Sequence, residues 1–320
     1  MDAVLGIDIA KAKFDVALQA PDGRVRRKTC PNTPAGFREL EAWLRRQHVT
    51  RVHACLEATG AYGDALATWL YDAGHHVSVV NPMVIHAFAA SQLSRTKTDR
   101  TDATLIARFC ATQQPARWTP TPHEMRELQA LVRRLEALHE MRTQETNRLG
   151  SGAATPAVAR SITTVIDTLT AEIAGVQAQI RDHFTQYPGL RSQRDLLTSI
   201  PGIGETTAAV LLAELFDKRY RSARQAAAFA GVVPRIVESG TLRRPGRLSK
   251  LGPGRVRKAL YFPALAALRC NPTLQAFRAR LRAKGKVPMV IIGAVMRKLI
   301  HIAYGVLKSQ RVYDPMHKHA

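Results

Sequence analysis

Four acidic residues have the types and spacing of a metal-dependent nuclease site: Asp8, Glu57, Asp99 and Asp102. Asp8 lies in the apolar run VLGIDIA and Glu57 ends the apolar run VHACLE, which predicts that both lie on strands. Asp99 and Asp102 are three residues apart in TKTDRTDA, just before the helical pattern ATLIARFC. Converging carboxylates can bind divalent cations, and two such ions about 4 Å apart stabilise both reacting oxygens of a phosphodiester. Alternatively, Asp99 or Asp102 caps the helix that begins near Thr101, which accounts for one acid but hardly for all four.

The charge of the chain indicates a nucleic-acid partner. Lys and Arg number 47 against 25 Asp and Glu, a formal charge of +22 over 320 residues. Basic side chains release condensed counterions when they bind phosphate backbones, although a basic membrane-surface protein is the alternative. We find neither a secretory signal nor an apolar run near the roughly 20 residues that span a bilayer. The four cysteines are far apart in sequence, which disfavours both a zinc site and a disulfide framework. We therefore expect a cytoplasmic protein with reduced cysteines and no membrane partner.

Residues 1–118 alternate between strand and helix patterns, which predicts a mixed sheet covered by helices. Thr33 is the expected N-cap of the first helix, with Pro34 at its first position, and Gly74 ends the second. The expected strands span residues 4–10, 13–19, 24–30, 52–57 and 75–82, and the expected helices span 33–47 and 62–74.

Residues 119–188 are expected to form an antiparallel helical hairpin. Leucines recur at a coiled-coil spacing in its first helix, and the turn GSGAATP separates it from the second. An intramolecular hairpin and an oligomerising coiled coil are both compatible with this pattern. The apolar positions are Leu128, Leu131, Leu135 and Leu138, then Val158, Ile162, Val165, Leu169, Ile173, Val176 and Ile180.

Residues 189–320 are expected to form a basic, mostly helical domain. Its first segment, RDLLTSIPGIGETTAAVLLAEL, resembles a helix-hairpin-helix motif, in which Gly202 and Gly204 allow a tight turn whose amides bind one phosphate. The alternative is a purely structural helical hairpin.

A second basic candidate is the run RRPGRLSKLGPGRVRK at residues 243–258, which contains no acid. Its glycines and prolines favour a flexible phosphate-binding loop over a charged helix face, although a solvated loop is the common alternative. The candidate nucleic-acid contacts are Arg243, Arg244, Arg247, Lys250, Arg255, Arg257 and Lys258. Just upstream, Ser239 precedes Gly240 in VESGTL. By itself this is weak support for a nucleophile, and Ser249 competes with it.

The motif GIDIAK also opens actin-like and sugar-kinase ATPases. Those proteins need later glycine-rich phosphate loops, and residues 60–190 contain none. The paired Asp99 and Asp102 and the positive charge favour a nuclease-type site instead.

Six motifs in this order resemble the insertion sequence 110 family of transposases, over nearly the whole chain: GIDIAK, CLEATG, SRTKTDRTDA, TSIPGIGETTA, FAGVVPRIVESG and GRVRKALYFPALAA. The resemblance implies a RuvC-like, ribonuclease-H-type domain at 1–118, a coiled-coil hairpin at 119–188 and a C-terminal transposase domain at 189–320. It places the Asp-Glu-Asp-Asp tetrad on Asp8, Glu57, Asp99 and Asp102, which would bind Mg²⁺ or Mn²⁺, and the catalytic serine on Ser239. After the Ser-Gly motif, several relatives carry a longer, glycine-rich segment, whereas the segment here is TLRRPGRLSKLGPGR.

The implied reaction is recombination of donor and target double-stranded DNA through a covalent phosphoserine intermediate, guided by a structured bridge RNA. The implied assembly is a homodimer or homotetramer in the prokaryotic, nucleoid-associated cytoplasm. A metal-dependent nuclease of the Holliday-junction-resolving kind is the alternative enzyme, and a non-enzymatic nucleic-acid-binding scaffold is an alternative of another class. With the tetrad and Ser239 far apart in sequence, we expect that neither end of the chain cuts DNA alone.

Overall fold

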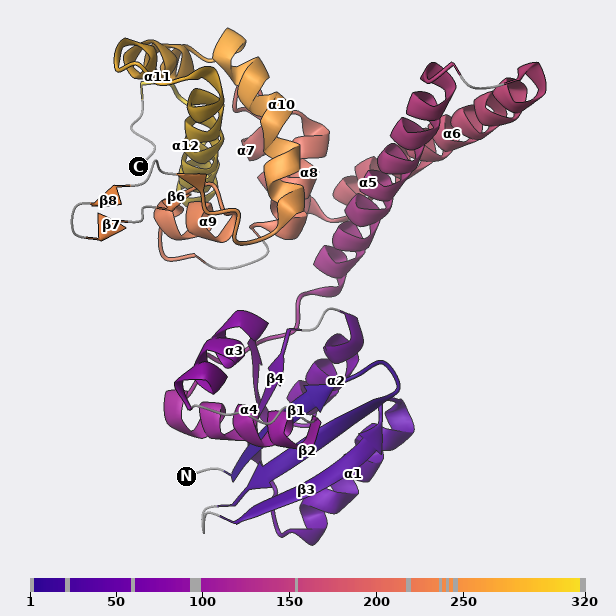
Figure 1. Ribbon diagram of the computed structural model, residues 1–320, viewed down its shortest axis with the longest axis vertical. Helices are drawn as coiled ribbons and strands as arrows, with labels where there is room; N and C mark the ends of the chain where they lie inside the picture. The colour runs from indigo at the N-terminus through magenta and orange to yellow at the C-terminus, as the bar shows by residue number, and fades with distance from the viewer. Residues whose placement is uncertain are drawn as a thin grey trace. The chain divides into compact units, whose positions relative to one another are not determined.

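The chain folds into two compact units, Met1–Pro120 and Thr121–Ala320, each with its own hydrophobic core (Figure 1). The structure is a computed structural model. It describes residues 3–20, 24–58, 61–92, 99–152, 155–216, 220–235, 238–239, 242–243 and 247–316, without the side chains of 61, 99–101, 238–239 and 242–243.

The first unit contains a five-stranded mixed sheet with the strand order β3-β2-β1-β4-β5. The first three strands are antiparallel, whereas β4 and β5 run parallel to β1. The prediction of a mixed sheet with helical cover is therefore confirmed. The strands are β1 (Ala3–Ile9), β2 (Lys13–Gln19), β3 (Val25–Pro31), β4 (Val52–Glu57) and β5 (His76–Val80).

Helices cover both faces of this sheet (Figure 1). Leu5, Ile7 and Ile9 of β1 share a core with α1 (Pro34–Arg46) and α2 (Ala61–Asp72). The alternate residues of β1 face α4 (Asp99–Gln113), because successive strand side chains point to opposite faces. The sequence patterns did not predict α3 (Pro82–Ser91), which packs against α4.

The predicted helix signals are present at α1. The Thr33 hydroxyl accepts a hydrogen bond from the Gly36 amide, and Pro34 occupies the first turn. A cap of this kind stabilises a helix by about 1 kcal/mol. Beyond α2, Gly74 has a φ of 83°, a conformation that favours glycine. The fourth helix begins at Asp99 rather than near Thr101.

Gly6 sets the distance between β1 and α4. A Cβ atom on Gly6 would lie 2.2 Å from both the carbonyl oxygen of Ala103 and the amide nitrogen of Ala107. The contact is therefore backbone against backbone, with Ala17 of β2 beside the two helix alanines in a small buried cluster. Only glycine at this position allows the helix to lie so close to the strand.

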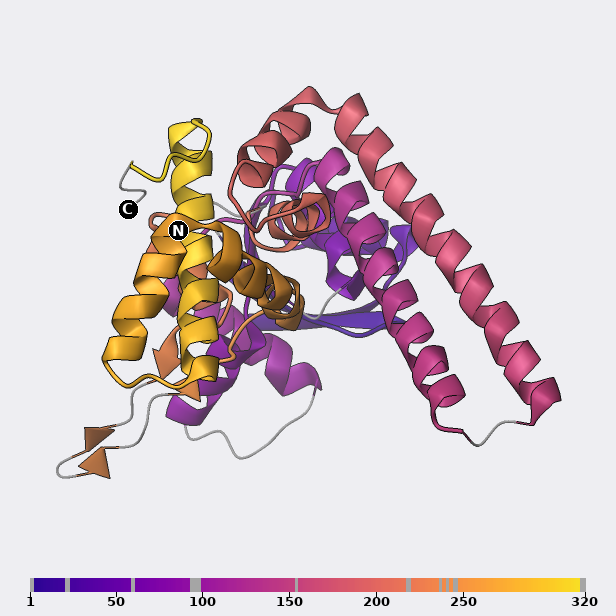
Figure 2. The same ribbon diagram turned by 90° about the horizontal axis from the view of Figure 1, so that it is seen from above.

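In the second unit, α5 (His123–Gly150) and α6 (Pro156–Gln186) form the expected helical hairpin within one chain, and Figure 2 shows them side by side. Leu128, Leu135 and Leu138 are buried as expected, whereas Val158 and Val165 are exposed. Whether the hairpin packs as a coiled coil stays a prediction.

The remaining helices surround α12 (Pro288–Ser309), which packs against four of them: α7 (Pro188–Thr198), α9 (Ala223–Phe229), α10 (Gly254–Cys270) and α11 (Pro272–Ala283). Among the described residues, α12 is the one helix that is long and apolar enough by composition to cross a membrane, and half of that stretch is buried in the unit. Its apolar residues, including Val295, Leu299 and Ala303, belong to the core. We therefore interpret α12 as the central core helix.

Two short strand pairs lie between α9 and α10. β6 (Pro234–Arg235) pairs with β9 (Arg247–Leu248), and β7 (Glu238–Ser239) pairs with β8 (Leu242–Arg243), all antiparallel. The segment therefore returns on itself, with β6 and β9 as the stem of a β-hairpin that contains Ser239.

The contact at Gly6 generates a prediction about stability. We expect Gly6→Ala to destabilise the first unit by about 1–3 kcal/mol or more, because the added methyl group meets backbone atoms that cannot rotate away. Urea unfolding followed by circular dichroism measures the change. Gly175→Ala in α6 is the matched control, since nothing lies within 4 Å of its added Cβ. We expect that control to be neutral or stabilising, since alanine favours helices over glycine. Equal effects of the two substitutions would contradict the close approach.

Candidate active site and nucleic-acid interface

Asp8 and Glu57 lie next to each other at the carboxyl ends of neighbouring parallel strands. The last paired residues of β1 and β4 are Ile7 and Leu56, so the following residues, Asp8 and Glu57, continue the same register. Both side chains are half-buried. Ligands of open α/β sheets bind at the carboxyl ends of the strands, which is where these two acids lie.

The direction of α4 brings the second pair of acids to the same end of the sheet. The Cys110 thiol, near the end of α4, lies 3.8 Å from the carbonyl oxygen of His53, which pairs with Val4 at the start of β1. Ala103 and Ala107 lie against Gly6 in the middle of β1. The helix therefore runs antiparallel to β1, and its first turns, with Asp99 and Asp102, lie toward Asp8.

A fifth acid, Asp15, lies beside these residues and was not predicted from the sequence. It is 6% exposed and lies directly opposite Asp8 in the antiparallel register of β1 and β2, so both side chains share the α4 face. The Thr29 hydroxyl donates a hydrogen bond to Asp15 Oδ1, and the Lys13 ammonium lies 3.2 Å from Oδ2. An acid inside the apolar run KFDVALQ is the same signal that singled out Asp8, so the sequence could have revealed it.

The acids fit a hard divalent cation by their chemistry and their location. Carboxylate oxygens are the ligands that Mg²⁺ and Mn²⁺ favour. The strand acids and the first turns of α4 lie at one end of the sheet, as the preceding contacts establish. No three His, Cys, Asp or Glu side chains lie close enough to hold a metal ion within the part of the chain that the structure describes. The Asp99 side chain lies outside that part.

Ser239 belongs to the second unit, on β7. It pairs with Leu242, and Glu238 pairs with Arg243 of β8. The side chains of Ser239 and Arg243, and all of Arg244, lie outside the described residues. The four acids are thus in one unit and the serine is in the other.

The two glycines of the PGIG turn differ in their surroundings. Gly202 has a φ of 103°, and a Cβ atom there would lie 2.7 Å from Ala267 Cβ of α10, so the turn and its packing both require glycine. Gly204 is exposed and is the N-cap of α8 (Glu205–Glu214). Glu205 in the first turn would repel a phosphate at this helix end. Six apolar residues of this motif are buried in the core of the second unit: Leu196, Leu197, Ile200, Ile203, Ala208 and Leu211.

Residues 254–258 form the start of α10 and are not part of a flexible loop, which corrects the sequence-based interpretation. After Gly254, the run RVRKAL contains no further glycine or proline, so the helix propagates from the Pro253 N-cap. The Arg257 guanidinium donates hydrogen bonds to the carbonyl oxygens of Ala230 and Gly252 at 3.1 and 3.0 Å, a structural role.

Two other predicted contact residues pair with acids of α5. Arg255 Nε lies 2.6 Å from Glu136 Oε2, and Lys258 Nζ lies 2.6 Å from Glu140 Oε1 and 3.4 Å from Glu136 Oε1. Hydrogen bonding to Glu140 and then to Glu136 raises the pKa of Lys258, and the same bond lowers the pKa of Glu140. These pairs join the helical hairpin to α10.

Arg247 and Lys250 remain available for phosphates. Both are exposed, and the structure records no ion pair for either with another described residue. Lys250 has a φ of 54°, within the segment between β9 and α10.

Comparison with known proteins identifies the family. A family model described as "Transposase" matches residues 5–152, and one described as "Transposase IS116/IS110/IS902 family" matches residues 194–279. The pilin gene-inverting protein of Moraxella bovis is 35% identical over 315 residues, 97% of each chain. The chain belongs to the IS110 family of transposases. The transposase is also 27% identical over 290 residues to the transposase for insertion sequence element IS1328 of Yersinia enterocolitica, covering 80% of this chain and 81% of the other.

Family membership confirms the resemblance drawn from the motifs and supports an enzyme of DNA recombination over the ATPase and membrane-surface alternatives. Among solved structures, T. thermophilus RuvC in complex with Holliday junction substrate aligns with 37% of the transposase and 99% of its own chain. The identity is 17% and the TM-score is 0.27, a likeness too small to carry an argument.

The ion pairs of α10 generate a prediction about DNA binding. We expect Glu136→Gln to increase the affinity of the transposase for non-specific duplex DNA, because Arg255 loses the partner recorded for it. One additional phosphate contact would steepen the slope of log affinity against log salt by about 0.9. Fluorescence anisotropy with labelled DNA over a salt series measures this slope. Glu172→Gln, on the exposed part of α6, removes the same charge without a recorded ion pair and is the control. Equal slopes for the two variants would exclude a specific role for Arg255.

Proposed function

We propose that this transposase cuts and rejoins donor and target DNA through a covalent intermediate on Ser239. The observation that carries the proposal is the arrangement of acids at one end of the sheet, from β1, β4 and α4, in a member of a transposase family. The chain is also strongly basic, which suits DNA binding, and Ser239 lies on a separate hairpin from which it could act as the nucleophile.

In the first step, the Ser239 hydroxyl oxygen attacks the phosphorus of the scissile phosphodiester. A serine–phosphate ester forms, the bond from phosphorus to one sugar oxygen breaks, and the serine proton ends on that leaving oxygen. The ester keeps the free energy of the phosphodiester, so a hydroxyl of the second DNA can attack it, restore the serine and complete the exchange without ATP.

The acids prepare the phosphate for this attack. Asp8, Glu57, Asp99 and Asp102 are the residues that would hold Mg²⁺ or Mn²⁺, which supplies charge neutralisation and polarises the phosphate. Asp15 adds a fifth carboxyl group opposite Asp8, held in place by Thr29 and Lys13. The order of the sheet, with antiparallel strands on one side of β1 and parallel strands on the other, supports the RuvC-like description of this unit.

Basic residues around the serine hold the DNA backbone in this proposal. Arg243, Arg244, Arg247 and Lys250 follow Ser239 closely in sequence and would neutralise phosphates on either side of the cut. The exposed Gly204 end of α8, which the helix-hairpin-helix resemblance offered as a backbone contact, contributes less, because Glu205 in its first turn would repel a phosphate. Arg255, Arg257 and Lys258 contribute less, because each already has partners within the chain.

The proposed assembly contains a bridge RNA and two or four copies of the transposase in the nucleoid-associated cytoplasm. The relative in Moraxella bovis is named for inverting a pilin gene. The high positive charge is compatible with binding RNA and DNA together.

The covalent step predicts a trapped adduct that depends on one serine. Incubation with radiolabelled donor DNA and Mg²⁺ should yield a protein–DNA adduct whose attachment maps to Ser239 by mass spectrometry. We expect Ser239→Ala to abolish the adduct. We expect Asp8→Asn to lower its yield by at least about 100-fold, because loss of a residue that only supports a metal ligand already costs about 10-fold to 100-fold. Ser249→Ala is the control, since Ser249 Oγ is buried and lies outside the hairpin.

The alternative enzyme gives a different result in the same experiment. If DNA cleavage survives Ser239→Ala without any adduct, water is the nucleophile and the transposase acts as a hydrolytic nuclease. If Asp8→Asn retains full recombination, the acids are not catalytic and the metal-dependent proposal is wrong.

The bridge RNA predicts a defined nucleic acid in the purified protein. We expect one structured RNA to co-purify after high-salt washing, and its ribonuclease digestion to abolish recombination. Sequencing the bound RNA tests this. A mixture of unrelated cellular RNAs, with recombination unaffected by ribonuclease, would contradict guidance and leave the serine chemistry intact.

A further inference from the structure

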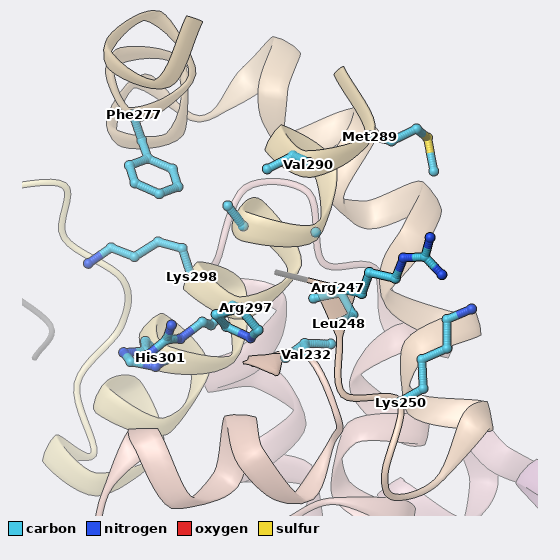
Figure 3. Close-up of a pocket in the computed structure, with 13 residues that line it drawn as sticks. Val232, Arg247, Leu248, Lys250, Phe277, Met289, Val290, Arg297, Lys298 and His301 are labelled. Atoms are coloured by element: carbon cyan, nitrogen blue, oxygen red, sulfur yellow. The ribbon is translucent and has the colours of Figure 1, made fainter. Parts of the chain in front are cut away.

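A cavity of about 580 Å³ lies in the second unit between α11, α12 and the β6–β9 stem. Pockets that bind small molecules have volumes of roughly 300–1,000 Å³, so it is large enough for a ligand. Figure 3 shows Phe277 of α11 with Lys298, Arg297 and His301 of α12 on the left, Arg247 and Lys250 on the right, and Val290 and Leu248 between them.

The interior of the cavity is apolar. Leu248, Phe277 and Val290 line it, and on α12 the neighbouring Gly293 and Ala294 leave room. A Cβ atom on Gly293 would lie 3.3 Å from Leu248 Cδ1, so β9 packs tightly on α12 at that point. An aromatic ring beside aliphatic walls suits a flat ligand.

The edge of the cavity is cationic. Arg247 and Lys250 come from the stem and the segment after it, and Arg297 and Lys298 come from α12. None of the described residues that line the cavity is acidic, and the structure records no ion pair for these four cations with another described residue. The edge of the cavity can therefore bind an anionic group.

His301 adds a polar group that lacks a partner. Its Nε2 atom is buried and has no hydrogen-bond partner among the described residues. Burial, followed by the charges of Arg297, Lys298 and Arg224, lowers the pKa of His301, so the ring is neutral at pH 7. A neutral imidazole nitrogen can donate or accept one hydrogen bond, depending on its tautomer. Buried polar atoms without partners are rare, so this one is a candidate for a ligand contact.

We infer that the cavity binds one nucleotide that is unstacked from its strand, with the base between Phe277, Leu248 and Val290 and the flanking phosphates at Arg247, Lys250, Arg297 and Lys298. A base has apolar faces for the interior and a polar edge for His301. A free phosphate would not require the apolar interior, and an apolar ligand would not require four cations. The inference rests on the proposed action on nucleic acid.

The cavity lies close in sequence to Ser239, the proposed nucleophile. Pro234, Arg247 and Leu248 of the stem line the cavity, and Ser239 follows Arg235 by four residues. Four residues of extended chain span at most about 14 Å, so the serine lies within a few nucleotides of the held base. Capture of that base fixes which phosphate the hairpin can approach.

The test measures affinity for a single extrahelical base. The full-length protein is titrated, in chelator so that no cleavage occurs, with three duplexes: fully paired, with a one-nucleotide bulge, and with the same bulge lacking its base. Base–aromatic stacking predicts that the base-bearing bulge binds about 5-fold to 100-fold tighter than the abasic one. The same pair of bulges in RNA identifies whether the nucleotide comes from RNA or DNA.

Two tryptophan variants locate the effect. Ala294→Trp fills the cavity and should remove the preference for the base-bearing bulge while leaving affinity for the paired duplex unchanged. Val165→Trp places the same side chain on the exposed face of α6, where Val165 is 43% exposed, and should keep the preference. Thermal unfolding monitors the fold of both variants.

Equal affinities for the base-bearing and abasic bulges in both DNA and RNA would overturn the inference, as would a preference that survives in folded Ala294→Trp. If Ala294→Trp does not fold, photocrosslinking of 5-iodouracil in the bulge to the unsubstituted protein decides the matter. A crosslink at Phe277 or Met289 supports the cavity, and crosslinks only elsewhere refute it. Because no cleavage is measured, failure here is distinguishable from failure of the serine mechanism.

Discussion

The close approach of α4 to β1 at Gly6 is the constraint on which the first unit depends. Helices normally pack on sheets through side chains, whereas here Ala103 and Ala107 meet the strand backbone itself. The approach lowers the start of α4 toward the carboxyl ends of β1 and β4, where Asp8 and Glu57 lie. A larger residue at position 6 would lift the helix and separate the two pairs of acids, even though none of those acids would change. In the proposed mechanism, packing at this one glycine therefore decides whether the two pairs of acids lie at the same end of the sheet.

Bringing these acids together costs electrostatic energy in the folded chain. Asp8 lies opposite Asp15 in one strand pair, and Glu57 continues the register beside it in the other, so all three share one face of the sheet. Like charges opposite each other on neighbouring strands are destabilising. Part of the compensation is visible at Asp15, which accepts a hydrogen bond from Thr29 and lies beside Lys13. A bound divalent cation would supply the rest.

The sequence predicted what depends on local pattern and missed what depends on distant partners. Strand β4 was expected at residues 52–57 and found there, because its apolar run is short and bounded, and the Thr33 cap follows a rule of neighbouring residues. Helix α3 was missed because PMVIHAFAAS is apolar on nearly all sides and has no clear helical stripe. The roles of Arg255 and Lys258 could not be predicted, since their partners in α5 are more than a hundred residues away in sequence.

In the second unit, too, a glycine allows one segment to pack closely against another, but the segment that approaches is a different one. Gly293 on α12 allows Leu248 of β9 to pack against the helix, so the stem of the Ser239 hairpin is fixed to the core helix of its unit. In both units, the missing Cβ of a glycine on a rigid element allows a functional segment to approach. At Gly6 the approaching segment carries acids, and at Gly293 it leads to the serine. A serine must reach phosphorus within a narrow range of distance and angle to attack it. Packing of Leu248 on the core helix, beside a cavity that can hold one base, holds β9, the strand that closes the stem of the serine hairpin. In the proposed mechanism, holding the stem in this way would favour attack at one phosphate over its neighbours along the strand.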